Sequence, residues 1–380
     1  MTTALVVAAQ YFTYFGVLGI YLPFFNLYCY HLGFNGAQIG LISGIRSVAL
    51  VVFPLIWGAV ADRYRKRRAI YLTCTIASTL VWTLLLFTRD FPVMLAVIAA
   101  YGVFYAPIIS FLEAIALDTL GDSKGRYGRL RAWGSVSFII VVLLMGQLTE
   151  RFSVSLVVPL ILAGSMTQGA LAFFIRSDMA GPRSTQFRDA FGFLSRPTVL
   201  FLLAGFLMLF SHGTYYGFFS IHLEELGLGK PFIGSAWAVA VLAEIVVMVN
   251  SQRIFSRFSL ESVLITAFVT AAVRWAVLGV TGHPAVILAS QTLHAVSYAA
   301  FHMASILYID RQASGSVKTM GQAINNSLSY GLGLMAGFLV NGALYDRWGA
   351  EGLFQMSAAS AVLGGGLVWL LTRTKPRSSR

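Results

Sequence analysis

A carboxylate and a guanidinium, Glu113 and Arg131, stand nine residues to either side of Asp122, each inside a long apolar run. If the two runs are antiparallel helices joined at Asp122, a rise of about 1.5 Å per residue places both charges at similar depth. Charges inside apolar helices are costly unless they meet each other or a polar ligand. We therefore expect Glu113 and Arg131 to line a polar cavity that takes up a small solute. The other interpretation places Arg131 in the inner headgroup layer of a bilayer.

A second set of polar residues lies in the second half of the chain. Counting from the intervening turns places Glu244, Arg274 and His294 at similar depth in three successive helices. One carboxylate, one permanent cation and one imidazole make a proton-responsive cluster, in which we expect the histidine to titrate near neutrality. His302 is counted with this set, although a hydrogen-bonded helix contact is the plainer interpretation of a lone histidine. A regular helix would turn His302 away from His294 by about 80°.

Arg46 lies about ten residues inside the apolar stretch 36–60, and no acidic residue stands three or four positions from it. Either a carboxylate on another helix or an anionic solute must satisfy its charge. Tyr14 and Tyr21 could offer hydroxyl groups to the same solute, although ring packing is the plainer interpretation for each. Three buried arginines against two buried glutamates favour an anion, namely a monocarboxylate, and the many aromatic residues favour an aromatic one. A neutral sugar or nucleoside remains open.

The elements that carry these residues are predicted by composition. The chain is 57% hydrophobic and only 11% charged, with a mean hydropathy of +0.76. Runs of about twenty apolar residues, the length that crosses a bilayer, recur along it. We therefore predict an all-α membrane protein with twelve spans, at 4–29, 36–60, 69–88, 92–118, 128–149, 154–175, 197–221, 232–250, 262–281, 284–309, 320–344 and 353–372.

The net charge of +12 is explained by where the basic residues stand. With both termini in the cytoplasm, 21 of the 27 lysines and arginines fall in cytoplasmic segments and four fall in external loops. This asymmetry follows the positive-inside rule and predicts a cytoplasmic (inner) membrane protein. Nucleic-acid binding is not expected, because no basic patch is interleaved with exposed aromatic residues.

An internal repeat divides the chain. The residues F24-F25, L32-G33 and I39-G40 recur as F218-F219, L226-G227 and I233-G234 with a constant offset of 194. The sequence therefore predicts two six-helix bundles, at 1–175 and 197–380, joined by a polar, arginine-rich cytoplasmic linker at 176–196.

The end of the second predicted span reads G58-A-V-A-D62-R63-Y-R-K-R67-R68 and resembles the loop signature of the major facilitator superfamily. The resemblance implies the fold of that superfamily and a gating role for Gly58, Asp62, Arg63 and Arg67. One residue departs from the signature, since Arg65 stands where a glycine is usual.

The segment Y127-G128-R129-L130-R131-A-W133-G134, with Glu113 before it, resembles the branch that holds lactose permease and the phenylpropionate permease-like proton symporters. The resemblance implies that Glu113 and Arg131, with Trp133 beside them, bind substrate. It implies that Glu244, Arg274, His294 and His302 couple transport to protons. Lactose permease has a carboxylate one turn after the histidine, where this chain has Ser297. The proton carrier must then be Glu244 or Glu113, or coupling is absent.

Together these features predict a proton-coupled symporter of a small organic solute that works by alternating access. The alternative is a proton-antiport exporter of a metabolite or drug. An enzyme is not expected, because the sequence has no HExxH, GxSxG or CxxC motif. We expect no cofactor and no metal, H+ as the coupling ion, and a monomer whose partners are its solute and the lipid bilayer.

Overall fold

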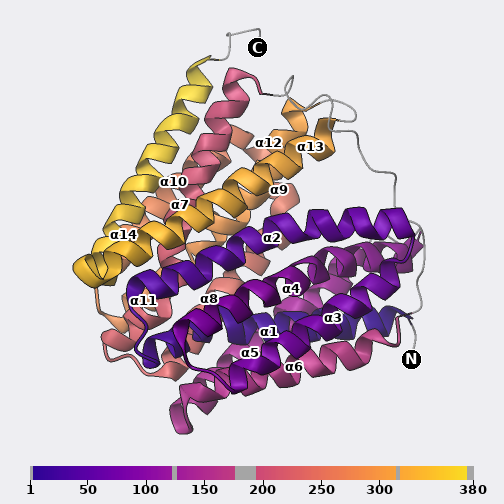
Figure 1. The fold of residues 1–380 in the computed structure, drawn as a ribbon. Helices are drawn as coiled ribbons and strands as arrows, with labels where there is room; N and C mark the ends of the chain where they lie inside the picture. Colours follow the sequence, from indigo (N-terminus) through magenta and orange to yellow (C-terminus); the bar gives the residue numbers. More distant parts are fainter. Residues whose placement is uncertain (1–2, 122–125, 176–193, 314–316, 375–380) are drawn as a thin grey trace. The chain divides into compact units, whose positions relative to one another are not determined.

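The computed structural model describes residues 3–121, 126–175, 194–313 and 317–374, which form helices joined by short turns, with no β-strand in these ranges (Figure 1). The all-α prediction is therefore confirmed. Ten helices within the described ranges are long and apolar enough to cross a membrane.

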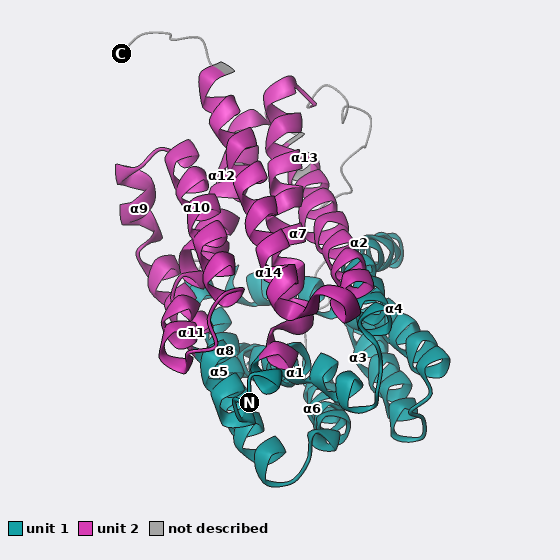
Figure 2. Cartoon of the chain, turned by 90° about the vertical axis from the view of Figure 1, so that its left-hand side faces the viewer, with its two compact units in different colours: residues 1–184, 223–238 teal, residues 185–222, 239–380 magenta. Residues whose placement is uncertain are grey.

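Two compact units make up the chain, shown in different colours in Figure 2. Unit 1 contains residues 1–184 together with 223–238, and unit 2 contains residues 185–222 together with 239–380. Most of the predicted linker at 176–196 lies outside the described residues, because the description stops at 175 and resumes at 194.

Unit 1 is built around α1, which packs against α5 and α6, while α4 packs against α2 and α3. Close approach requires small residues, and a Cβ at Gly19 would lie 3.1 Å from the backbone oxygen of Phe138. The elements of this unit are α1 (Thr3–His31), α2 (Gly36–Tyr64), α3 (Arg67–Thr83), η1 (Leu84–Leu86), α4 (Phe91–Leu120), α5 (Tyr127–Arg151), η3 (Val154–Leu156) and α6 (Val157–Ala172).

Helix starts in unit 1 follow local side-chain chemistry. Asn35 accepts a hydrogen bond from the backbone N–H of Gln38, and the Gln38 side chain accepts one from the backbone of Asn35. This reciprocal capping box satisfies two donors that the helix itself leaves free, so α2 begins at Gly36. At the start of α4, the side chain of Asp90 accepts a hydrogen bond from the backbone N–H of Val93, a one-way cap without the return bond.

Unit 2 contains most of α7, the part of α8 from residue 239 onward, and α9 to α14, and α10 packs against α14. The α7–α8 turn, at residues 223–238, belongs to unit 1. The elements are α7 (Arg196–Glu225), α8 (Lys230–Val249), α9 (Ser251–Arg257), α10 (Leu260–Leu278), α11 (Pro284–Gln291), η5 (Ala295–Ala300), α12 (Phe301–Gln312), α13 (Val317–Asn325), η6 (Asn326–Gly333) and α14 (Leu334–Thr374).

Two predicted spans of unit 2 are not regular helices. The stretch predicted at 284–309 consists of α11, the π-helical segment η5 and α12, and a second π-helical segment, η6, precedes α14. The 41-residue α14 breaks at Gly349, whose φ of 62° only glycine adopts readily. This break falls in the gap that the sequence placed between the spans 320–344 and 353–372.

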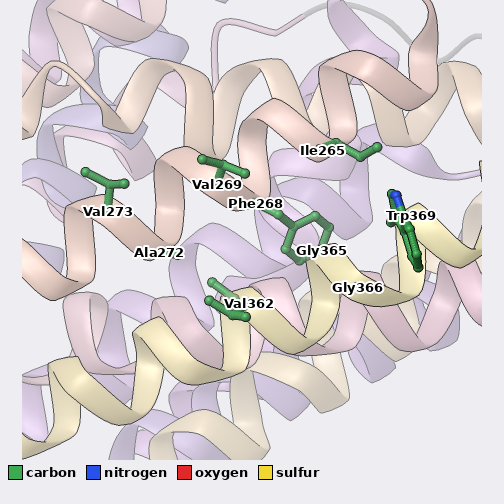
Figure 3. A pocket seen from close by; sticks show the side chains of 10 residues that line it. Ile265, Phe268, Val269, Ala272, Val273, Val362, Gly365, Gly366 and Trp369 are labelled. Atoms are coloured by element: carbon green, nitrogen blue, oxygen red, sulfur yellow. The ribbon is translucent and has the colours of Figure 1, made fainter.

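An apolar groove of about 410 Å³ runs between α10 and α14 (Figure 3). Figure 3 shows Val269 and Val273 of α10 and Val362 and Trp369 of α14 along its walls. No ionisable side chain lines it, and none of the predicted site residues belongs to it. The candidate site must therefore be sought at the buried charges.

Candidate functional site

The deepest charge in unit 2 is Arg274 of α10, whose side chain is 0% exposed. One terminal nitrogen lies 2.7 Å from Nδ1 of His294, and the other donates to Oε1 of Gln291 at 2.7 Å. The guanidinium also lies over the ring of Tyr215, 4.2 Å from its centroid. Arg274 is thus held by two hydrogen bonds and an aromatic face, which is how a cation is made tolerable in an apolar interior.

These contacts fix the proton of His294. An arginine can only donate, so Nδ1 of His294 must accept and its ring proton must sit on Nε2. That Nε2–H lies 2.9 Å from Oε1 of Glu244 and donates to it. Arg274, His294 and Glu244 therefore form one hydrogen-bonded chain across α10, the α11–η5 junction and α8. The sequence groups these three residues correctly, and from it we expect the histidine to titrate near neutrality. His294 cannot take a second proton while Arg274 donates to it, so Glu244 is the acid of this chain.

His302 joins the set through a row of rings. The ring of Tyr298 stacks on His294 at 5.1 Å and on His302 at 6.4 Å, with interplanar angles of 11° and 8°. Nδ1 of His302 lies 2.5 Å from the hydroxyl of Tyr330 in η6. The expected divergence of the two histidines is wrong because η5 is π-helical, and its extra residue per turn brings them into line.

Three contributors to this site were not among the predicted residues. Gln291 precedes His294 by three positions, so both lie on one helix face, and that spacing was a usable signal. Nothing in the sequence around Tyr215 and Tyr298 distinguishes them from aromatic residues that only pack between helices. His212, another buried histidine, lies 5.9 Å from the His294 ring and bonds through Nδ1 to the backbone oxygen of Met208.

Glu113 and Arg131 both lie in unit 1, partly buried, but they do not form an ion pair within the described residues. The Arg131 guanidinium instead stacks on the ring of Phe15, 3.9 Å from its centroid. Trp133, two residues further along α5, is 51% exposed. The substrate-binding role of these three residues stays a prediction.

Arg46 of α2 lies over the ring of Tyr21, 4.5 Å from its centroid. Tyr21 and Tyr14 are both buried, at 6% and 4% exposure. Tyr14 stacks on Tyr105 of α4 with ring centroids 5.3 Å apart. The structure therefore brings the three predicted residues Arg46, Tyr21 and Tyr14 into one aromatic region of unit 1.

The predicted gating segment ends α2. Asp62 and Arg63 are exposed, and a Cβ at Gly58 would meet no atom within 4 Å. Arg67 forms an ion pair with Asp118 of α4 at 2.5 Å. The gating role of this segment stays a prediction.

Arg65, the residue that departs from the signature, ends α2 in the left-handed conformation with φ 53° and ψ 35°. A side chain there costs about 1 kcal/mol, which glycine avoids. We expect Arg65→Gly to raise the free energy of unfolding by up to about 1 kcal/mol, measured as the melting temperature in detergent. Arg63→Gly, the same exchange inside α2, should lower it by about 1 kcal/mol. Equal shifts for the two variants would contradict the prediction.

A cluster of ion pairs in unit 1 was not predicted. Glu224, at the end of α7, lies 2.6 Å from Nε2 of His31 and 2.9 Å from Nζ of Lys230. The backbone N–H of Lys230 donates to Glu150 of α5 at 3.0 Å. We call these four residues the α1–α7 ion cluster. It ties the α7–α8 turn to the ends of α1 and α5.

Long apolar helices in two units, with a buried arginine–histidine–glutamate chain in one of them, are the construction of a multi-pass membrane transporter. The sequence profile of the MFS_1 like family matches residues 5–356, and the chain belongs to that family. It is a major facilitator superfamily transporter of small solutes, not an enzyme.

Relatives cover nearly the whole chain. A probable 3-phenylpropionic acid transporter of Escherichia coli (strain K12) is 26% identical over 362 residues, which are 93% of this chain and 94% of the relative. A maltose permease of Geobacillus stearothermophilus is 24% identical over 97% of this chain and 94% of its own length. The crystal structure of the nucleoside transporter NupG matches with a TM-score of 0.88 at 17% identity, covering 99% of this chain and 100% of that one.

Proposed function

We propose that the protein takes up a small organic solute together with protons, by alternating access. The solute is a monocarboxylate or aromatic acid, or else a sugar or nucleoside. In this proposal the chain forms twelve spans in two six-helix bundles, at 1–175 and 197–380, with both termini in the cytoplasm. It acts as a monomer in the cytoplasmic membrane, without a cofactor.

The count of twelve is supported by the irregular spans. Ten helices in the described residues meet the length and hydropathy of a span by themselves. One of these ten elements, Met320–Arg373, contains the break at Gly349 and is long enough to cross twice. The segments α11, η5 and α12 would supply the remaining crossing.

The observation that carries the coupling proposal is the chain from Arg274 through His294 to Glu244. The His294 side chain is 4% exposed and that of Glu244 is 21% exposed, so Glu244 is the end that a proton can reach. A proton on Glu244 would remove the charge that His294 Nε2–H donates to and would leave Arg274 without a nearby anion. Because a charge left without its counterion is costly in an apolar interior, proton uptake would favour a different arrangement of the helices around α10.

The α1–α7 ion cluster supports the alternating-access part of the proposal. His31 and Glu150 lie in the first predicted bundle, and Glu224 and Lys230 lie in the second. Ion pairs at the helix ends can break and re-form during each cycle, since exposed pairs contribute only about 1 kcal/mol each or less. We expect this cluster to be closed in one access state and open in the other.

The test is uptake into proteoliposomes of radiolabelled 3-phenylpropionate, maltose or uridine, driven by a proton gradient that is acid outside. We expect one of these probes to accumulate, and we expect Glu244→Gln to reduce that accumulation at least about tenfold while solute exchange without a gradient persists. Glu351→Gln, at an exposed position of α14, is the matched control and should be unaffected.

Two outcomes would contradict the proposal. Full gradient-driven uptake by both the Glu244→Gln and the Glu113→Gln proteins would exclude the predicted proton carriers. Accumulation only when the lumen is acid would identify proton antiport, the export alternative.

A further inference from the structure

Arg46 is a partly buried cation that has no counterion among the described residues. The sequence leaves two ways to satisfy it, a carboxylate on another helix or an anionic solute. No hydrogen bond or ion pair joins its guanidinium to any residue within the described ranges, and its Nε is buried without an acceptor. The guanidinium lies over the face of Tyr21. A carboxylate of the chain, the first explanation, is therefore not found among the described residues.

The aromatic contact cannot replace a counterion. Five N–H groups of an arginine need acceptors, and a ring face offers none in the plane of the guanidinium. The neighbouring hydroxyl of Tyr21 is also buried and has no hydrogen-bond partner in the described structure. Arg46 and Tyr21 thus present at least two unused donors side by side, and a carboxylate, which accepts through two oxygens, is the group that fits both.

A row of aromatic rings extends from this point across three helices of unit 1. Tyr14 stacks on Tyr105, and Tyr105 stacks on Tyr101 with centroids 4.7 Å apart. Trp82 of α3 lies 4.8 Å from Tyr101 and 5.9 Å from Tyr21, so the row returns to the arginine. A flat apolar ligand has an extended aromatic wall beside the two donors.

The other arginine of unit 1 is placed differently. Arg131 has Glu113 as a neighbouring charge and covers the ring of Phe15 at 3.9 Å. Glu113 offsets part of the charge of Arg131, whereas no carboxylate among the described residues pairs with Arg46. An anionic solute therefore gains more at Arg46 than at Arg131.

We infer that Arg46 and Tyr21 form the carboxylate-binding subsite of the transporter, and that the solute is an aromatic monocarboxylate whose ring lies along the row of Tyr14, Tyr105 and Tyr101. The inference rests on the proposed function and narrows its solute class. A neutral sugar or nucleoside would leave Arg46 without a counterion. A solute with two carboxylates would bring one charge too many, since this subsite holds a single cation.

The test compares 3-phenylpropionate with 3-phenylpropionamide, a neutral analogue of nearly the same shape, by calorimetry on the purified full-length protein. We expect the acid to bind at least about tenfold more tightly than the amide, the effect of a charge-assisted hydrogen bond. Arg46→Gln should bring the acid to the affinity of the amide and leave the amide unchanged. Tyr21→Phe should weaken the acid about threefold or more. Arg89→Gln removes the same charge at an exposed position and should change nothing.

Several results would overturn the inference. One is a wild-type protein that binds the acid and the amide with nearly equal affinity. Another is an Arg46→Gln protein that still binds the acid more tightly than the amide. A third is an Arg131→Gln protein that loses this preference while Arg46→Gln keeps it. Should Arg46→Gln fail to fold, the wild-type ratio and the Tyr21→Phe protein decide the question. Proton-driven uptake of maltose or uridine without binding of the acid would refute this inference and leave the proposed function intact.

Discussion

Arg274→Gln is expected to destabilise the protein by about 3–5 kcal/mol and to reduce proton-driven uptake at least about a hundredfold. The substitution removes a fully buried cation, and it leaves the carboxylate of Glu244 bonded to His294 but without the positive charge that balances it through that histidine. It also removes one of the two hydrogen bonds that link α10 to Gln291 and His294. Melting temperature in detergent measures the first effect, and uptake into proteoliposomes measures the second.

The double variant Arg274→Gln/Glu244→Gln separates stability from coupling. Both charges are then gone, and the glutamine amide at position 274 can still donate to Nδ1 of His294. We expect most of the lost stability to return, because the double variant no longer buries the uncompensated charge of Glu244. Proton-driven uptake should stay absent, because no carboxylate remains in the hydrogen-bonded set of residues 274, 294 and 244. A double variant as unstable as the Arg274→Gln protein would mean that the charges of Arg274 and Glu244 do not compensate each other.

Arg274→Lys is the conservative control. Lysine keeps the charge, but it lacks the planar fork that reaches Gln291 and His294 together while stacking on Tyr215. We expect a stability near that of the wild type and an uptake reduced about tenfold. An uptake equal to the wild type would show that charge alone matters at this position.

Much of the fold follows from the sequence because membrane spans obey a simple physical rule. A run of about twenty apolar residues must be helical to satisfy its backbone in hydrocarbon, so boundaries such as Gly36 for α2 could be expected. The π-helical segment Ala295–Ala300 could not be expected, because its residues A-V-S-Y-A-A suit a regular helix equally well. The local sequence therefore carries no signal for the irregular winding of this segment.

The candidate site shows the same division. Counting residues from a turn gives the depth of a residue along its helix. Equal depth was enough to predict that Glu244, Arg274 and His294 lie close together. Rotation about the helix axis depends on tilt and packing, and it decides which groups touch. For this reason the sequence could not place His294 between the two charges. It also could not show that the guanidinium of Arg131 lies over the ring of Phe15 and forms no ion pair with Glu113.

Gly337→Ala is expected to lower the melting temperature of the protein, and Gly337→Leu to prevent stable folding. A Cβ at Gly337 would lie 2.5 Å from the backbone oxygen of Phe210 and 3.2 Å from the Cα of Gly213. Backbone atoms cannot move aside as a flexible side chain can, so α7 and α14 must separate. Overpacking of this kind costs about 1–3 kcal/mol for a small addition and more for a large one.

Gly366→Ala is the matched control in the part of α14 beyond its break at Gly349, because a Cβ there would meet nothing within 4 Å. Alanine favours a helix over glycine by about 1 kcal/mol, so this variant should be as stable as the wild type or slightly more stable. Both variants exchange a helical glycine for alanine, but only the Cβ at position 337 would meet the backbone of α7. Equal melting temperatures for Gly337→Ala and Gly366→Ala would show that the helices do not meet at this point.

The same contact connects packing to the proposed coupling site. α7 carries Tyr215, whose ring lies under Arg274, and Gly213 stands only two residues before it. If α7 moves away from α14, the Tyr215 ring moves with it and the aromatic support of the buried cation is disturbed. We therefore expect the fraction of Gly337→Ala protein that does fold to show reduced proton-driven uptake, whereas Gly366→Ala retains it. A folded Gly337→Ala protein with full uptake would separate the packing of these helices from the positioning of Arg274.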